Sequence, residues 1–267
     1  MPDTLSLPDA EATAYSPEYF TVPGPWSFTA EAVPTATPFP PASLNDPNAS
    51  PYALFRTLSQ TADGLLAAPG WVATLEEWEH DVDNESYGYL SDGSPQPRIY
   101  QRETWYHIDE NGRVFESVSF VRDAEENILE TSAFANGQFV PRAAPEEPFP
   151  QKPYRLHLND QFLGNLVANL RQGNGSASLA ELDEQSVMLF RVDEYFTNND
   201  PALYSQAILG DQVSAYLDLE TGLLRALQTV ARLEDGSQRT LEWMRLTVAN
   251  DQEPPEAVIE VLNEVRE

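Results

Sequence analysis

Cysteine is missing from all 267 residues of the chain. Its absence excludes disulfides, thiolate metal sites and cysteine nucleophiles. The sequence also has no run of 18 apolar residues, so we expect no membrane-spanning helix. The first residues, Met1 to Thr4, lack the basic and apolar stretches of a signal peptide. We therefore expect any export signal or anchor to be missing from this sequence.

Basic residues are scarce. Only 15 Lys and Arg face 43 Asp and Glu, which gives a formal net charge of −28, and Lys152 is the one lysine. A field of that sign repels phosphate backbones and anionic lipid headgroups. The composition therefore excludes nucleic acid as a partner and argues against direct electrostatic docking on a bilayer.

The composition changes near Pro51. Residues 1–51 hold 11 of the 22 prolines and no Lys or Arg, and the stretch 33–41 favours extended polyproline II. We predict an extended arm or linker over residues 1–50 and a single domain over 51–267. Segments of this kind often tether a domain to a surface. The arm also carries more aromatic residues than a spacer needs: Tyr15, Tyr19, Phe20, Trp26 and Phe28. One alternative is therefore that part of the arm lies along a sheet edge or a partner, which would allow a homo-oligomer to form through the arm.

The rest of the chain reads as strands with few helices. Helices are predicted over 51–68, with Ser50 as the cap and Pro51 in the first turn, over 159–171, and after Pro254-Pro255. Strands separated by hairpin signals are predicted over 71–82, 100–108, 113–122, 128–134, 186–196, 203–209, 212–219, 223–233 and 238–249. This order predicts a mainly β (α+β) fold with an antiparallel sheet, because no parallel crossover pattern occurs.

A family resemblance appears at the residues 216–224, YLDLETGLL, where a strand ends in Leu-Asp, turns through Glu-Thr-Gly and returns. Asp235-Gly236-Ser237 and Pro254-Pro255-Glu256 follow, and residues 105–114 form an earlier hairpin. The pattern resembles LolA-like proteins, the lipoprotein carriers and the related RseB-type sensors. The resemblance implies a large curved antiparallel sheet, an open half-barrel, with two to three covering helices. Such proteins bind acyl chains or partner polypeptides in the concavity and perform no chemistry.

The predicted ligand-binding residues are large apolar side chains on the strands and on the helix 159–171. Core packing is the alternative explanation for each of them. The set is Trp78, Trp105, Phe120, Phe162, Leu166, Met188, Phe190 and Trp243.

A calcium loop is a second candidate site. Asp81, Asp83, Glu85 and Asp92 stand at positions 1, 3, 5 and 12 of a segment that echoes an EF-hand loop. Ser86 replaces the glycine of such a loop, and strands rather than helices flank it. The alternative is a solvated acidic hairpin without a cofactor.

The leading hypothesis is a non-enzymatic, extracytoplasmic binding or sensory domain, tethered to or near a membrane, that buries a lipid, acyl chain or partner segment. One alternative is a surface or filament subunit whose arm adds as a strand to a neighbour's sheet edge. The third is a hydrolase that uses carboxylates, although the sequence has no Gly-x-Ser-x-Gly elbow and no other catalytic motif.

Overall fold

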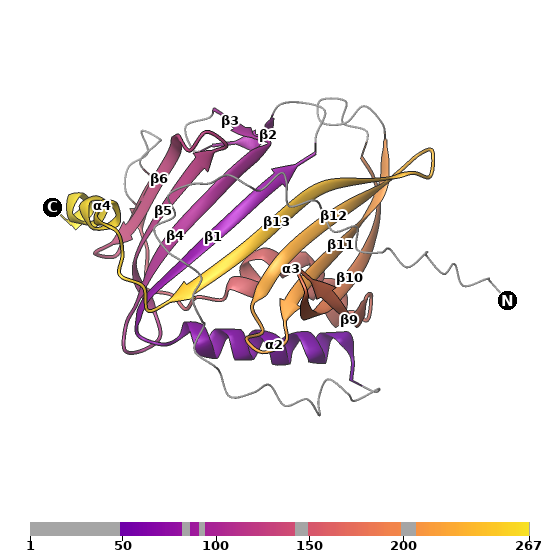
Figure 1. The fold of residues 1–267 in the computed structure, drawn as a ribbon, viewed down its shortest axis with the longest axis horizontal. Helices are drawn as coiled ribbons and strands as arrows, with labels where there is room; N and C mark the ends of the chain where they lie inside the picture. Colours follow the sequence, from indigo (N-terminus) through magenta and orange to yellow (C-terminus); the bar gives the residue numbers. More distant parts are fainter. Residues whose placement is uncertain (1–48, 82–85, 91–93, 142–148, 199–206, 267) are drawn as a thin grey trace.

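One antiparallel sheet runs through the whole domain in the computed structural model, which describes residues 49–81, 86–90, 94–141, 149–198 and 207–266. Its 11 strands lie in the order β8-β7-β6-β5-β4-β1-β13-β12-β11-β10-β9 (Figure 1). β8 and β9 are the two edges and do not pair with each other, so the curved sheet stays open. The predicted fold class, an open half-barrel with covering helices, is confirmed.

The first half of the sheet is built by residues before the helix α3. The bounds are β1 Gly70–His80, β4 Ile99–Ile108, β5 Val114–Asp123, β6 Ile128–Ala135, β7 Gln138–Pro141 and β8 Phe149–Pro150. A separate two-stranded ribbon is formed by β2 Ser86–Tyr89 and β3 Pro95–Pro97.

The second half follows α3 and returns to the centre of the sheet. Its strands are β9 Ser176–Leu182, β10 Gln185–Asn198, β11 Ile208–Asp218, β12 Leu224–Leu233 and β13 Gln238–Asn250. β1 pairs antiparallel with β13, so that Val72 lies opposite Asn250, and this pair joins the two halves.

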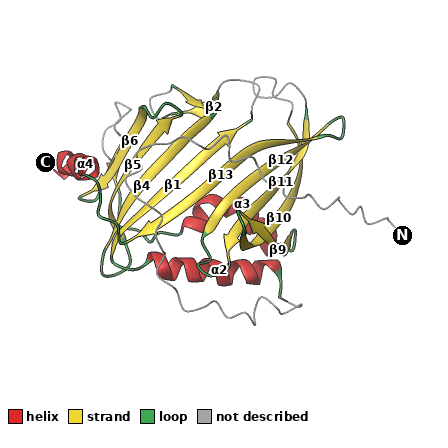
Figure 2. Ribbon diagram, in the orientation of Figure 1, coloured by secondary structure: helices red, strands yellow, loops and turns green. Residues whose placement is uncertain are grey.

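Helix α2, Pro51–Leu66, opens the described domain (Figure 2). Ser50 Oγ accepts a hydrogen bond from Ala53 N at 3.2 Å, and Pro51 stands in the first turn, as predicted. The apolar stripe repeats every three or four residues and is buried, while the predicted members Leu54 and Leu65 lie half-buried at its margin. The stripe is Phe55, Leu58, Ala62 and Leu66.

Helix α3, Leu158–Arg171, packs beside α2 on the same face of the sheet, which we call the inner face. The two helices and the sheet share one core. Phe55 of α2 meets Phe190 of β10 edge-to-face with ring centroids 5.5 Å apart, and Leu166 and Leu170 of α3 belong to the same cluster. None of the helices in the described part of the chain is long and apolar enough to cross a bilayer.

The turn between β11 and β12 holds the helices in place. Asp218 Oδ1 accepts hydrogen bonds from the backbone N–H of Glu220 and of Thr221, at 3.0 and 2.7 Å, and from Thr221 Oγ1. Burial alone would raise the pKa of the Asp218 carboxyl, but these donors and the Arg225 charge outweigh it and hold that pKa below its usual value. The Asp-x-x-Thr-Gly pattern is therefore a turn whose backbone is fixed by one carboxylate.

Asn159 ties α3 to that turn and to α2. Its buried amide nitrogen donates to Gly222 O at 2.8 Å and to Ser59 Oγ at 3.2 Å, and its Oδ1 accepts from Leu224 N at 3.0 Å. All three partners lie in other elements, so this side chain sets where α3 begins above the sheet.

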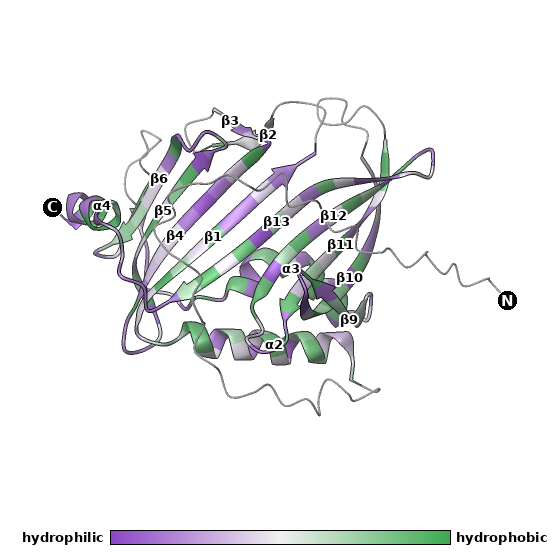
Figure 3. Cartoon of the chain, viewed as in Figure 1, coloured by the Kyte–Doolittle hydropathy of each residue, from purple (hydrophilic) through white to green (hydrophobic). Residues whose placement is uncertain are grey.

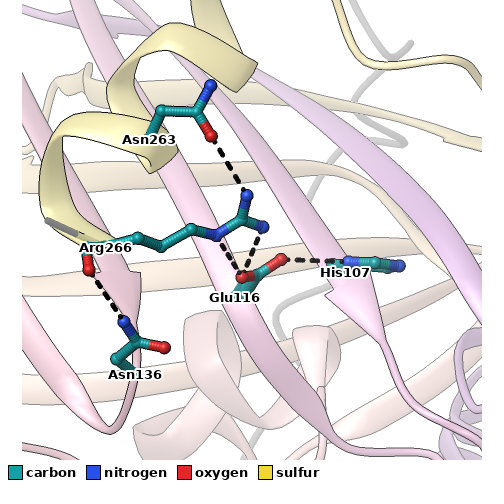
Figure 4. A network of polar contacts seen from close by, with 5 residues as sticks. All are labelled: His107, Glu116, Asn136, Asn263 and Arg266. Atoms are coloured by element: carbon teal, nitrogen blue, oxygen red, sulfur yellow. Dashed lines mark hydrogen bonds and ion pairs between the residues drawn. The ribbon is translucent and has the colours of Figure 1, made fainter.

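The opposite, outer face carries helix α4, Glu256–Arg266, over β5 and β6. Val258 and Leu262 of α4 pack on Trp105 and Phe120. An ion-pair network secures the last turn: Arg266 Nη2 lies 2.6 Å from Glu116 Oε1, and Glu116 Oε2 lies 3.2 Å from His107 Nδ1 (Figure 4). The terminal helix was predicted, but it covers the outer face and not the concavity.

The mixed composition of β9 explains why the sequence did not indicate this strand. β9 has the sequence SASLAEL, in which small, polar and apolar residues are mixed, and no strand was predicted there. It forms because β10 supplies a pairing edge, with Phe190 opposite Ala177. The segments 203–209 and 212–219 were predicted as separate strands, but β11 is continuous from Ile208 to Asp218, and the residues 199–206 lie outside the described part.

Gly222 offers a test of this docking. It has a φ of +70°, and a Cβ added there would overlap the backbone carbonyl of Leu58 in α2. We expect Gly222→Ala to lower the free energy of unfolding by about 2 kcal/mol or more, measured by urea denaturation. Gly236→Ala is the matched control, because Gly236 has a φ of +83° but no atom within 4 Å of the new Cβ. Equal losses for the two variants would show that contact with α2 does not matter.

Candidate functional site

The candidate site is a cavity between α3 and the inner face of β10 to β13. Its volume is about 570 Å³, within the size range of small-molecule sites. Seven of the lining residues are apolar: Phe162, Leu163, Leu166, Ile208, Val213, Leu227 and Leu241. Two neutral polar residues of α3, Gln161 and Asn165, and Thr229 of β12 complete the neutral part of the lining.

Helix α3 is irregular where it borders the cavity. Leu163 has non-helical dihedrals, φ −115° and ψ 20°, which produce a kink, and Gly164 follows it. A Cβ added to Gly164 would meet no atom within 4 Å. The helix therefore presents backbone instead of a side chain at this point, and space is left open beside the cavity.

Three carboxylates face the same cavity from three different strands. Glu194 of β10 lies directly opposite Asp211 of β11, and Glu242 comes from β13. Asn169 Nδ2 of α3 donates to Glu194 Oε1 at 2.7 Å, which joins the helix to the sheet at this wall. Glu242 Oε2 lies 3.4 Å from Nδ1 of His80, whose side chain is 2% exposed.

The environment of Asp211 changes the pKa of its carboxyl. Burial raises the pKa of its carboxyl, and the negative charges of Glu194 and Glu242 add to the rise, to about 6. Its Oδ1 is buried and accepts no hydrogen bond within the described residues. That oxygen therefore lacks a donor, although a hydrogen bond from the backbone N–H of Asp211 itself offsets part of the rise in the pKa of the carboxyl.

A row of aromatic rings continues from the cavity along β1. Phe162 of α3 lies 6.3 Å from Trp78, measured between ring centroids, and Trp78 stacks on Tyr100 at 6.0 Å and on His80 at 5.5 Å. Trp78 Nε1 donates to Glu76 Oε2 at 2.9 Å, so its ring edge is satisfied inside the protein. Phe162 lines the cavity, and the other rings extend from it along β1 and β4.

The eight residues predicted to bind a ligand do not share one face. Phe162 and Leu166 line the cavity. Trp78, Met188 and Phe190 lie on the inner face, in or against the core under the helices. Three others differ from the expectation, because strand alternation turns them to the outer face: Trp105, Phe120 and Trp243. Trp105 is a core residue there, 0% exposed, with its Nε1 donating to Glu103 at 2.7 Å.

Sequence reasoning missed the carboxylates of the cavity. Glu194, Asp211 and Glu242 are separated along the chain and do not form a motif. The strand register brings them together, and register is a property of the folded sheet. Alternation was a signal for Glu194 and Glu242, which lie in predicted strands and share a strand face with the core residues Val192 and Met244. Asp211 fell between the predicted strands 203–209 and 212–219, so no such signal marked it.

Most of the proposed calcium loop lies outside the described residues: Asp83, Glu85 and Asp92. Asp81 is described, and two arginines surround it. Arg98 Nη2 lies 3.0 Å from its Oδ1, and Arg239 Nε lies 2.9 Å from its Oδ2. Both oxygens of Asp81 therefore have charged partners already. Calcium binding by the other three residues stays a prediction.

The sequence matches no protein-family model. A search of curated proteins finds no match either. Among solved structures, LprF from Mycobacterium bovis is similar at 10% identity with a TM-score of 0.35, covering 79% of this chain and 100% of its own. A β-barrel-like protein of domain of unknown function DUF1849 from Brucella abortus is similar at 10% identity with a TM-score of 0.20, and the match covers 70% of this chain and 99% of that protein. A DUF1329 family protein from Desulfovibrio piger is similar at 7% identity with a TM-score of 0.24, and the match covers 80% of this chain and 100% of that protein. Because the TM-scores are low, the function is inferred below from the cavity itself.

Asp211 makes stability depend on pH in a direction unusual for a carboxylate. The pKa of its carboxyl is raised in the folded state, so the ionised carboxylate destabilises the fold. This loss of folding free energy is absent below the ordinary Asp pKa of about 3.9 and complete above about 6. We expect Asp211→Asn to raise the melting temperature at pH 7 and above, with the gain shrinking to nothing near pH 4. Asp193→Asn, at an exposed position on β10, is the control and should show no such pH dependence. A gain for Asp211→Asn that is the same at every pH would contradict the assignment.

Proposed function

We propose that this domain is a non-enzymatic binding domain that holds an apolar ligand in the cavity between α3 and β10 to β13. The observation that carries the proposal is the cavity: about 570 Å³, with seven apolar residues in its lining. The proposal includes the extracytoplasmic location and the tethering arm expected from the composition of residues 1–50.

The charge of the cavity selects among apolar ligands. Glu194, Asp211 and Glu242 add negative charge to a wall that is otherwise neutral, and the chain as a whole carries a net −28. A fatty-acid carboxylate would meet repulsion from all three side chains. A cationic or hydrogen-bond-donating head group would instead supply Asp211 Oδ1 with the donor it lacks. The cavity therefore favours an acyl or alkyl chain with a positively charged or neutral donor head.

Surface assembly remains a second candidate because of one observation. β9 is an open edge of the sheet, and its Leu179 is 66% exposed. If copies associate along this edge, Leu179→Lys should abolish oligomers in size-exclusion chromatography with light scattering, while the unchanged chain should show them at high concentration. A chain that is monomeric at every concentration would remove this candidate.

Binding can be tested with three probes of equal chain length that differ in the head group. Dodecylamine should bind more tightly than dodecanol, and dodecanol more tightly than dodecanoic acid, as measured by displacement of a fluorescent apolar dye at pH 7.5. Binding of none of the three would refute the proposed site. A preference for the acid would refute the role of the carboxylates and leave the cavity itself intact.

A variant that fills the cavity gives the structural control. Gly164→Leu places a side chain at the cavity without a clash at Cβ, and we expect it to weaken dodecylamine binding by about tenfold or more. Gly64→Leu on α2 is the matched change, since Gly64 is exposed, has nothing within 4 Å of a new Cβ and is not part of the lining. It should leave binding unchanged.

A further inference from the structure

The cavity borders two apolar clusters that stay separate in the core. The large cluster beneath α2 and α3, with the side chains packed on it, supplies what we call the helix-side wall: Phe162, Leu163, Leu166, Val213 and Leu227. The second is a small cluster of Ile208, Ala231, Leu233 and Leu241, and two of its members supply what we call the far wall: Ile208 and Leu241. The cavity therefore offers apolar surface in two places.

The order of residues along the strands puts carboxylates between the two walls. Along β11, Asp211 lies between Ile208 of the far wall and Val213 of the helix-side wall. At about 3.3 Å per residue, these neighbours stand about 10 and 7 Å from it along the strand. On β13, Leu241 of the far wall comes directly before Glu242, and the large cluster resumes two residues further on. Figure 3 shows hydrophilic positions interrupting hydrophobic ones along these strands.

Strand register joins the polar side chains into one band across the cavity. Glu194 of β10 lies opposite Asp211 of β11, and Thr229 of β12 lies opposite Glu242 of β13. All four residues line the cavity. Each of the four strands therefore contributes one polar side chain to the band, and a ligand that reaches both walls must lie across it.

Within this band, Asp211 is where a ligand donor is needed. Asn169 Nδ2 already donates to Glu194 Oε1 at 2.7 Å, and Nδ1 of His80 lies 3.4 Å from Glu242 Oε2. Asp211 Oδ1 is buried and accepts no hydrogen bond from the part of the chain that the structure describes. A ligand N–H that satisfies this oxygen would stand between the two walls, with apolar surface on either side of it.

We propose that the ligand of this cavity is an amphiphile whose cationic or N–H donor group lies in the interior of the molecule, between two apolar arms. One arm packs on the helix-side wall and the other on the far wall. This inference rests on the proposed function and specifies where along the ligand the donor stands. A ligand with a terminal head can cover only one wall while its head meets Asp211, and the rest of a long chain then projects into water.

Two isomeric amines test the position of the donor. Dihexylamine and dodecylamine have the same composition and are both cationic at pH 7.5, but their nitrogen is central in the first and terminal in the second. In the full-length chain, below the concentrations at which micelles form, we expect dihexylamine to displace a fluorescent apolar dye with about tenfold higher affinity or more. Equal affinities, or a preference for dodecylamine, would overturn this inference and leave the proposed function standing. Binding of neither isomer would refute the proposed function itself.

A pair of variants locates the second arm. Leu241→Ala removes part of the far wall, so we expect the ratio of the two affinities to fall by about fivefold or more. Leu233→Ala is the matched control, because Leu233 belongs to the same small cluster and is 8% exposed, against 7% for Leu241, but does not line the cavity. It should leave the ratio unchanged.

Melting curves of both variants show whether they are folded, and Leu241→Val replaces Leu241→Ala in the same comparison if the alanine variant is not. A ratio that does not change in the Leu241 variant, or that falls equally in Leu233→Ala, would overturn the place of the second arm on the far wall.

Discussion

The position of α3 depends on a single buried amide. No side chain caps the helix at His157, and instead Asn159 bonds Ser59 of α2, Gly222 O and Leu224 N. A buried amide is costly unless its groups are satisfied, and here three partners from two other elements satisfy it. The cavity wall begins only two residues later, at Gln161. Any shift of Asn159 would therefore move the wall, and the turn fixed by Asp218 serves the site as well as the fold.

The cavity combines burial from water with three neighbouring carboxylates, and burial disfavours their negative charge. Burial in the cavity lowers the local dielectric, and that strengthens the repulsion of Glu194 and Glu242 on Asp211. The fold tolerates this because Asn169 satisfies Glu194 and His80 approaches Glu242, which leaves the strain concentrated on Asp211. Groups that are left unsatisfied in an otherwise well-bonded protein often mark the place where a ligand completes the network.

Local chemistry made some elements predictable. Ser50-Pro51 starts α2, Pro254-Pro255 precedes α4, and the hairpin signals separate most strands at nearly the observed residues. The face of each strand was harder to assign. Alternation shows that a strand has two faces, but Trp105 and Trp243 look the same in sequence as Trp78, and only the packing of α4 and α3 decides which face is which. The acidic wall needed register between distant strands, which propensities do not contain.

The pairing of β1 with β13 has a consequence for synthesis of the chain. The first long strand has its partner at the far end of the sequence, with Val72 beside Asn250, so the middle of the sheet cannot close until nearly the whole polypeptide has left the ribosome. Until then the free side of β1, with Leu75 and Trp78, is an unpaired strand edge exposed to other nascent chains. We therefore expect pairing of β1 with β13 to be a late and slow step in folding, because it requires residues from both ends of the domain.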